Sequence, residues 1–314
     1  MVGNDDQHDI KPRPLALDAS AQSASPDRPA FLARPEKPRP LRQRGWFKSV
    51  RRVAAVVLVA YLLILVVMMW FEESLIFVPF SSPDDDWHPS GLAIEDAWFD
   101  APGGVRIHGW YVHHEHPSAA VLFAHGNAGN ITHRDHVLRA LHDEVGVSVL
   151  IFDYRGYGRS SGRPSGEGIL ADARAARAWL ARREKIPENA IVVMGESIGG
   201  AVAVDLAADG ARGLIVENSF ASLPEVAAYH MPWIPVHLMM RTRLNSAERI
   251  RQYHGPLLQS HGDHDKIVPL ASAQRLFAAA NEPKKFILLP GRDHNDVHSP
   301  AYYEQVRQFV ESLK

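Results

Sequence analysis

The sequence predicts an α/β fold in which a mostly parallel central sheet carries an antiparallel hairpin at its N-terminal side and helices on both faces. From about residue 90 onward, short apolar runs alternate with segments of helical spacing, which is typical of a parallel sheet with crossover helices. Ahead of that alternation, two strand-like segments flank Pro102-Gly103-Gly104, a sequence that favours a tight turn between antiparallel strands. We therefore expect residues 90–314 to form one domain.

The elements of this domain follow from the spacing of apolar residues. Continuous apolar runs predict strands that are covered on both faces, and apolar residues three or four apart predict helices. The predicted strands are 92–99, 105–113, 119–124, 147–152, 191–194, 213–217, 257–260 and 286–289. The predicted helices are 132–145, 165–183 with Ser165 as N-cap, 198–208, 271–280 and 302–313.

Residues 221–255 break this rhythm, because they contain Met231-Pro232-Trp233-Ile234-Pro235 and have little strand character. Two roles stay open for them. One is a connection whose short helices pack on the core, which we favour. The other is a short cap over the active site whose Trp, Met and Leu side chains form an apolar acyl pocket.

A charge-free run of nineteen residues, 53–71, precedes the domain. As a helix it would measure roughly 28 Å, close to the thickness of a bilayer core. We predict a transmembrane signal-anchor helix over 46–72 that stays attached, because Met68-Met69-Trp70 stands where a small-residue cleavage site would be needed. Residues 1–45 are rich in Pro, Arg, Asp and Ser without an apolar period, which predicts a disordered cytoplasmic tail.

The charges that flank the run predict its orientation. Six basic residues lie within residues 39–52, just before the run, whereas residues 72–104 hold acidic residues and no Lys or Arg; the six are Arg39, Arg42, Arg44, Lys48, Arg51 and Arg52. The positive-inside rule then places the N-terminus in the cytoplasm and the large domain on the non-cytoplasmic side, the periplasm if the source is bacterial. Trp46 and Trp70 lie where interfacial aromatic residues are expected.

Composition narrows the possible chemistry. The chain has no cysteine, which excludes disulfides, a thiol nucleophile and a Cys-ligated metal. Its net charge of −2 argues against a nucleic-acid partner. His113-His114-Glu115-His116 lacks the His-Glu-x-x-His spacing that puts two metal ligands on one helix face. We therefore expect no metal and no cofactor.

The pentapeptide Gly195-Glu196-Ser197-Ile198-Gly199 joins a predicted strand directly to a predicted helix. In a turn this tight the serine adopts a strained backbone conformation, and glycines two residues to either side keep side chains from colliding with it. This context predicts that the Ser197 hydroxyl is exposed at the carboxyl end of the sheet as a nucleophile.

A serine nucleophile needs a base, and the base needs a carboxylate that orients it. In hydrolases with this strand-turn-helix serine, the acid and then the histidine follow along the chain. Asp265 and His294 stand in that order, each in a loop just after a predicted strand. Asp263 is a rival for the acid and His298 a weaker rival for the base.

Acyl transfer also requires hydrogen-bond donors aimed at the oxyanion. We assign one to the backbone N–H of Ile198 and the second to the backbone N–H of Asn127. The latter lies in the glycine-containing loop after the strand 119–124, where Gly126 and Gly129 allow close backbone approach.

Together these motifs resemble the α/β-hydrolase superfamily, and within it the membrane-anchored serine hydrolases that include bud-emergence-type proteins and protein depalmitoylases. The matching stretches are 125–131, 153–165, 195–200, 261–269 and 291–296. The resemblance implies a Ser197, Asp265, His294 triad behind a membrane anchor. Arg292 and Asp293 replace a typically small residue, and these charges can alter the pKa of His294 or access to it.

The sequence thus predicts a membrane-anchored serine hydrolase that cleaves carboxylic esters or thioesters through an acyl-enzyme. The expected partners are the membrane, through residues 53–71, and a small-molecule, lipid or acylated-protein ester substrate. Two alternatives stay open: an amidase or peptidase that uses the same triad, and a non-catalytic membrane scaffold.

Overall fold

The structure, a computed structural model, describes residues 43–81 and 85–313. The chain divides into two units, residues 1–54 and 55–314, with the boundary inside helix α1 (Gln43–Trp70). Nearly all of the predicted tail 1–45 lies outside the described residues, as do Arg39 and Arg42.

Helix α1 contains the predicted membrane span. Its segment Gly45–Trp70, 26 residues long, is apolar and long enough to cross a bilayer, and its most apolar window is not buried by the described part of the chain. Its length and composition therefore make it a candidate membrane span. A signal sequence meets the same criterion of length and composition. A short helix, α2 (Glu72–Ile76), follows directly.

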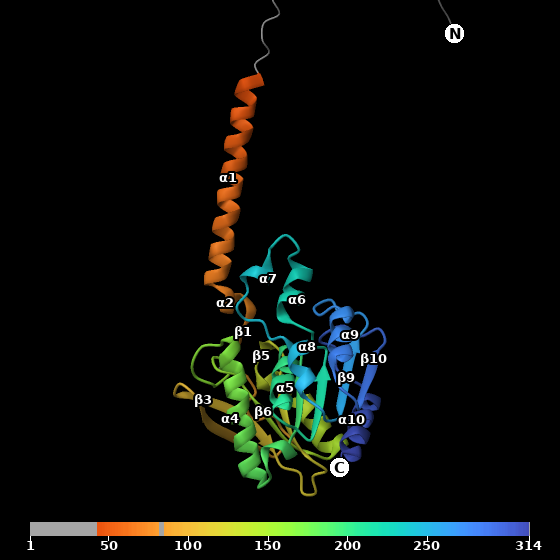
Figure 1. The fold of residues 1–314 in the computed structure, drawn as a ribbon. Coiled ribbons are helices and arrows are strands. Elements are labelled where there is room, and N and C mark those ends of the chain that lie inside the picture. Colours follow the sequence, from red (N-terminus) through yellow and green to blue (C-terminus); the bar gives the residue numbers. More distant parts are fainter. Residues whose placement is uncertain (1–42, 82–84, 314) are drawn as a thin grey trace, which may run out of the picture. The chain divides into compact units, whose positions relative to one another are not determined.

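The predicted α/β architecture is confirmed. Eight strands form one sheet in the order β10-β9-β8-β7-β4-β6-β3-β2. The strands β6, β4, β7, β8, β9 and β10 run parallel, whereas β3 pairs antiparallel with both β6 and β2 (Figure 1). Their bounds are β2 Ile94–Ala101, β3 Val105–Val112, β4 Ala120–Ala124, β6 Ser148–Phe152, β7 Val192–Glu196, β8 Gly213–Glu217, β9 Leu257–Gly262 and β10 Lys284–Leu289.

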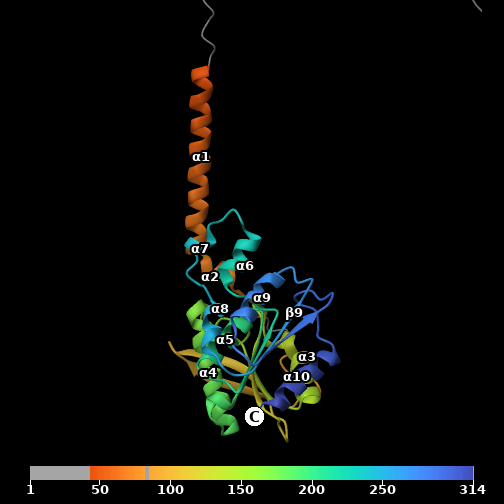
Figure 2. The ribbon, with the colours of Figure 1, turned by 45° about the vertical axis from the view of Figure 1, so that its right-hand side comes forward.

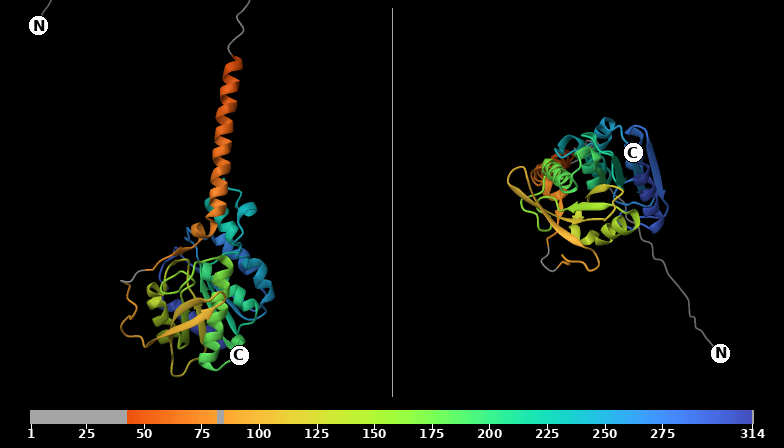
Figure 3. Two further views of the ribbon diagram at one scale, coloured as in Figure 1. Left: turned by 90° about the vertical axis from the view of Figure 1, so that its left-hand side faces the viewer. Right: turned by 90° about the horizontal axis from the view of Figure 1, so that it is seen from below.

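Helices cover both faces of the sheet because the central strands are apolar on both sides. Leu122 and Val193 face one buried cluster, which includes residues of α4 (Gly166–Glu184), α5 (Ile198–Ala208) and α9 (Leu270–Ala279). Val121 and Phe123 face the other, which includes residues of α3 (Asp135–Arg139) and α10 (Pro300–Ser312). Figure 2 shows α4 and α5 on one side and α3 with α10 on the other, and the view from below in Figure 3 shows both layers.

One predicted helix differs in form. Residues 132–145 are a 3₁₀ turn (Ile131–Arg134), the short helix α3 and a wide π turn (Ala140–Val145). The last turn widens because the backbone N–H groups of both Gly146 and Val147 donate to the Leu141 carbonyl. Ser165, by contrast, caps α4 as predicted, its hydroxyl accepting from the Gly168 N–H.

One feature at the carboxyl edge of the sheet was not predicted. Val78–Pro79 (β1) pairs in parallel with Ala128–Gly129 (β5), which ties the segment after α2 to the loop after β4. Residues 221–255 contain short helices, as expected for this segment: α6 (Leu223–His230), α7 (Val236–Met239) and α8 (Ser246–Arg249), followed by a 3₁₀ turn (Ile250–Gln252). Figure 1 shows α6 and α7 beyond this edge of the sheet.

Candidate active site

Ser197 occupies a strained turn between β7 and α5. Its φ of 56° and ψ of −118° lie in a region that side-chain-bearing residues rarely adopt. A Cβ on Gly195 would lie 2.0 Å from the Gly199 carbonyl oxygen, and one on Gly199 would lie 2.1 Å from the Ala124 carbonyl oxygen. Both obstacles are backbone atoms, so the two glycines are required for the turn to close.

Gly199→Ala is expected to destabilise the protein by about 3 kcal/mol, because the new methyl group must displace the end of β4. This corresponds to a loss of roughly 10 °C in melting temperature. Gly103→Ala is the matched control: its Cβ meets nothing within 4 Å, although its φ of 88° still costs some strain. Thermal unfolding in detergent measures both, and equal shifts would contradict the steric explanation.

The structure brings Ser197, His294 and Asp265 together. The Ser197 hydroxyl lies 3.0 Å from His294 Nε2, and His294 Nδ1 lies 2.7 Å from Asp265 Oδ2. All three side chains are largely buried: the Asp265 carboxylate is 0% exposed and the His294 ring is 5% exposed. With Nδ1–H donating to the carboxylate, Nε2 is left free to accept the serine proton.

Asp265 is held by more than His294. Its Oδ1 accepts from the backbone N–H groups of Ile267 and Val268 at 2.9 and 2.7 Å, and His261 Nε2 lies 3.4 Å from Oδ2. The two backbone donors hold the carboxylate in a fixed orientation, and the Nε2–H of His261 donates to the Val268 carbonyl at 2.9 Å.

The two rivals lie elsewhere. Asp263 accepts from the Gly291 backbone N–H at 2.6 Å and so caps the turn before His294. His298 lies 3.4 Å from the buried Glu217 carboxylate and stacks on Tyr302. Burial works to lower the pKa of His298, but the Glu217 charge outweighs it and raises that pKa. 

The two expected oxyanion donors, Asn127 and Ile198, both line the same cavity as Ser197. Within the described residues, no hydrogen bond is found for the backbone N–H of either one. Two unpartnered N–H groups beside a serine hydroxyl are the arrangement that a developing oxyanion needs.

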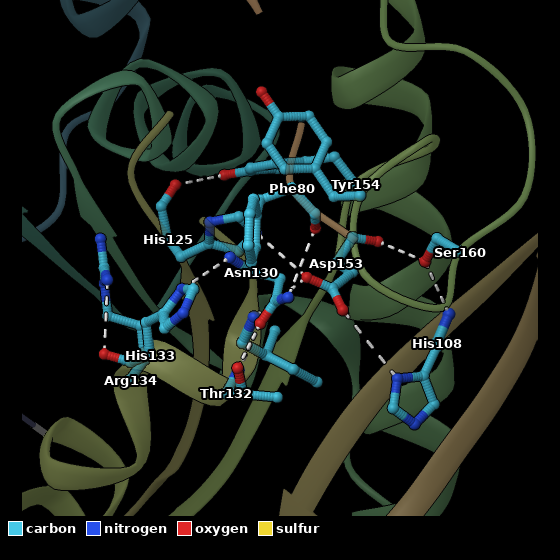
Figure 4. Close-up of polar contacts among 12 residues, drawn as sticks. Phe80, His108, His125, Asn130, Thr132, His133, Arg134, Asp153, Tyr154 and Ser160 are labelled. Carbon is cyan, nitrogen blue, oxygen red and sulfur yellow. Dashed lines mark hydrogen bonds and ion pairs between the residues drawn. The ribbon is translucent and has the colours of Figure 1, made fainter. Parts of the chain in front are cut away.

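The Asn127 side chain holds this loop to the segment after α2. Its Nδ2 donates to the Ile76 carbonyl at 2.6 Å, and its Oδ1 accepts from the Tyr157 hydroxyl at 2.8 Å. Next to it, Asn130 Nδ2 donates to the Phe80 carbonyl (Figure 4). We call residues 76–80 the strap. No motif signalled this role, because the strap is a short apolar run broken by Pro79, and such a run does not indicate which segment it contacts.

A buried polar cluster around Asp153 contacts the loop after β4, which contains Asn127 (Figure 4). Asp153 Oδ1 accepts from the Ile131 N–H at 3.0 Å, and the fully buried His125 and His108 rings lie 3.7 and 4.0 Å from its carboxylate. Burial raises the pKa of Asp153. Burial, aided by the Arg134 charge, lowers the pKa of His125 to about 3, so the ring stays neutral.

This burial predicts acid sensitivity. Unfolded His125 titrates near 6.5, whereas its folded pKa is about 3, so the unfolded state binds more protons within that window. Stability is therefore lost as the pH falls from 6.5 toward 3, by up to ~1.4 kcal/mol per pH unit from this group. The decrease in melting temperature between about pH 7 and about pH 5 should be smaller for His125→Gln than for the unaltered chain. Parallel losses would contradict this assignment.

Three further residues hold the His294 loop. Asn218 Nδ2 donates to the His294 carbonyl at 2.9 Å. The Asp293 carboxylate accepts from the His294 N–H at 2.8 Å and pairs with Lys266 Nζ at 2.7 Å. The Lys266 ammonium and these backbone donors lower the pKa of Asp293. Asp293 thus joins the loop of His294 to that of Asp265, which explains the charge at this position.

The carboxylate of Glu196, the residue before Ser197, also has a fixed partner. Its carboxylate is held by Arg134 through two hydrogen bonds of 3.0 and 3.2 Å. Sequence alone gave no signal for this pair, because 62 residues separate the partners.

Two cavities lie at the candidate site, one lined by Ser197 and the other by His294. An apolar cavity of about 380 Å³ opens at Ser197 and Ile198 and is lined by methionine and aliphatic side chains, among them Met68, Met69, Val226, Ala227, Met231 and Met239. A more polar cavity of about 630 Å³ reaches His294 and is lined by residues such as Arg134, Glu196, Glu217 and His298. Within the described residues, no three His, Asp or Glu side chains are grouped to hold a metal ion.

The chain is similar in sequence to several known proteins. The chain is 40% identical over 271 residues to the uncharacterized protein Rv2307c of Mycobacterium tuberculosis, an alignment that covers 84% of this chain and 96% of that protein. It is 32% identical over 270 residues to the alpha/beta hydrolase domain-containing protein WAV2 of Arabidopsis thaliana, covering 77% and 88%. With protein bem46 of Schizosaccharomyces pombe it shares 33% over 198 residues, covering 60% and 66%.

Residues 115–246 match the family described as serine aminopeptidase, S33. The fold is similar to that of the Pyrococcus furiosus esterase Pf2001, with a TM-score of 0.63 and 20% identity over 75% of this chain and 99% of that one. At that identity the likeness concerns the fold alone. The chain belongs to the bem46-like group of the α/β-hydrolase superfamily and is a hydrolase.

Proposed function

We propose that this hydrolase is a membrane-anchored serine esterase or thioesterase that works through an acyl-enzyme. The observation that carries the proposal is the chain of contacts from Asp265 through His294 to Ser197, which ends in an apolar cavity. Such a cavity suits the acyl chain of an ester.

In the proposed mechanism, Ser197 Oγ attacks the carbonyl carbon while its proton passes to His294 Nε2. Asp265 stabilises the imidazolium, and the N–H groups of Asn127 and Ile198 bind the oxyanion. Collapse of the intermediate breaks the ester bond, and His294 returns the proton to the leaving alcohol or thiol. Water activated by His294 then attacks the acyl-enzyme and frees Ser197 and the acid.

The two cavities suggest where each half of the substrate binds. The apolar cavity at Ser197 would take the acyl chain, with residues 221–255 acting as a short cap. The polar cavity reaches His294, the group that must protonate the leaving group, and would take the alcohol or thiol portion. An amphiphilic ester therefore fits this division best.

An acyl-chain series tests the proposal. Ala227→Phe places a ring in the apolar cavity, so kcat/KM for a dodecanoyl ester should fall about tenfold relative to acetyl, as expected when binding energy of ~1.4 kcal/mol is lost. Leu288→Phe, on the exposed edge strand β10, is the control and should leave the series unchanged. An identical chain-length profile in both variants would contradict the acyl pocket.

The matched family's description, serine aminopeptidase, makes amide hydrolysis the second candidate. An aminopeptidase needs a free carboxylate for the substrate ammonium group. Three carboxylates line the polar cavity. Glu196 is paired with Arg134 and Glu217 accepts from the Tyr302 hydroxyl, so only Asp296, which accepts from the Asp293 backbone N–H at 2.8 Å, is left to bind an ammonium group. We favour ester cleavage because the cavity beside Ser197 is apolar. Parallel assays of p-nitrophenyl esters and aminoacyl p-nitroanilides discriminate the two; faster amide turnover would reverse the preference.

The membrane assignment is part of the proposal. The basic residues before the span and the acidic residues after it support a cytoplasmic N-terminus and a catalytic domain on the non-cytoplasmic side. C-terminal fusion to alkaline phosphatase, which folds only outside the bacterial cytoplasm, should be active. Activity of a cytoplasm-only fluorescent fusion instead would overturn this orientation.

A further inference from the structure

We propose that residues 231–240, which we call the cap tip, insert into the lipid leaflet that receives the C-terminal end of α1. The cavity beside Ser197 would then take its acyl chain laterally from that leaflet, so the substrate class is a bilayer-resident acyl ester. This inference rests on the proposed function and membrane anchoring.

The depth of the cap tip follows from one contact with α1. The Tyr61 hydroxyl donates to the Trp233 carbonyl at 2.7 Å. Tyr61 lies nine residues before Trp70, which is about 13 Å along the helix axis. If α1 spans a bilayer, a group at that position lies within the hydrocarbon region rather than in water.

The chemistry of the cap tip suits that depth. Residues 226–240 contain no Asp, Glu, Lys or Arg. Trp233 and Leu238 are 62% and 87% exposed, the kind of apolar surface that an interfacial segment presents to lipid. Arg241 and Arg243 follow at once, where cations at the level of lipid headgroups are expected.

Glu72 ties the end of the cap tip to the end of α1. Its carboxylate accepts from the backbone N–H groups of Arg241 and Thr242 at 2.9 and 2.7 Å, and the residue is only 6% exposed. Swinging the cap tip away would leave this buried carboxylate without its donors. The cap tip is therefore held on the side of the domain from which the anchor leaves.

The cavity is bounded by both partners of this contact. Met68 and Met69 of α1 and Met231, Met239 and Met240 of the cap tip all line it. Flexible, unbranched methionine side chains accommodate chains of varied shape. An acyl chain that passes between α1 and the cap tip would reach Ser197 without crossing water.

Because the chain has no cysteine, a single introduced one can report depth. Full-length Leu238→Cys, labelled with the fluorophore NBD, is placed in vesicles of phosphatidylcholine and phosphatidylglycerol containing nitroxide-labelled lipid. Leu288→Cys on β10, 46% exposed, is the matched control. We expect strong nitroxide quenching at position 238 and little at 288. Equal quenching, or protection at 238 from both nitroxide lipid and aqueous iodide, as a protein partner would give, overturns the inference.

Enzyme activity on a soluble and on a membrane-embedded ester tests the insertion independently. Leu238 does not line the cavity, so Leu238→Asp should leave hydrolysis of soluble p-nitrophenyl acetate unchanged. Hydrolysis of a vesicle-embedded long-chain ester should fall about tenfold, because a carboxylate is costly in lipid. Leu288→Asp should affect neither substrate, and an unchanged vesicle rate in Leu238→Asp overturns the inference. Absence of all turnover in the unaltered chain would instead contradict the proposed function, while the quenching result would still decide insertion.

Discussion

Ser197→Ala is expected to lower kcat for a short-chain p-nitrophenyl ester by about 10⁴-fold or more. The hydroxyl that lies 3.0 Å from His294 Nε2 is the proposed attacking group, and alanine leaves no nucleophile in its place. The substitution removes one oxygen atom and adds none, so the melting temperature should change little. Steady-state kinetics and thermal unfolding on the same preparation separate loss of chemistry from loss of fold.

The double variant Ser197→Ala/His294→Gln makes this result more specific. If serine and histidine act as one unit, removing the base after the nucleophile costs nothing further, and the double variant retains the rate of Ser197→Ala. Additive losses would indicate that His294 acts on something other than the Ser197 proton. Turnover near the unaltered rate in Ser197→Ala would leave the non-catalytic scaffold, or another nucleophile, as the better explanation.

Asp265→Asn is the second large effect, with kcat expected to fall by about 10³-fold or more. An asparagine can present an N–H donor to His294 Nδ1, which favours the wrong tautomer and removes the charge that stabilises the imidazolium. Asp263→Asn is the matched control two residues away. Its carboxylate caps the Gly291 N–H, and the asparagine oxygen can still accept that bond, so kcat should change by no more than about twofold.

The paired variants decide between the two acids directly. A larger loss in Asp263→Asn than in Asp265→Asn would overturn the assignment of the acid. Comparable losses in both would mean that the loop geometry, rather than one carboxylate, supports His294.

Much of the fold followed from apolar spacing. The central strands are continuous apolar runs, and α5 and β8 begin and end where that spacing predicts. The three residues of the candidate triad could be predicted from the sequence for a related reason. Ser197, Asp265 and His294 each follow a strand, and the carboxyl ends of parallel strands meet at one edge of a sheet. Adjacency in the fold could therefore be inferred from local patterns.

What the sequence did not indicate depends on contacts between distant segments. The strap reaches the oxyanion loop through the Asn127 amide and a two-residue strand, too short to leave a pattern. The Arg134–Glu196 pair and the Glu72 contacts with residues 241–242 join segments far apart in the chain. Polar contacts of this kind have no period, so only the folded arrangement reveals them.

The proposed function depends on Ser197 as the nucleophile. The most direct measurement is reaction of the full-length protein with a fluorophosphonate, followed by peptide mass spectrometry. We expect a single adduct on the peptide that contains Ser197, no adduct in Ser197→Ala, and a much slower reaction in His294→Gln. An adduct on another residue, or undiminished labelling of Ser197→Ala, would contradict this assignment.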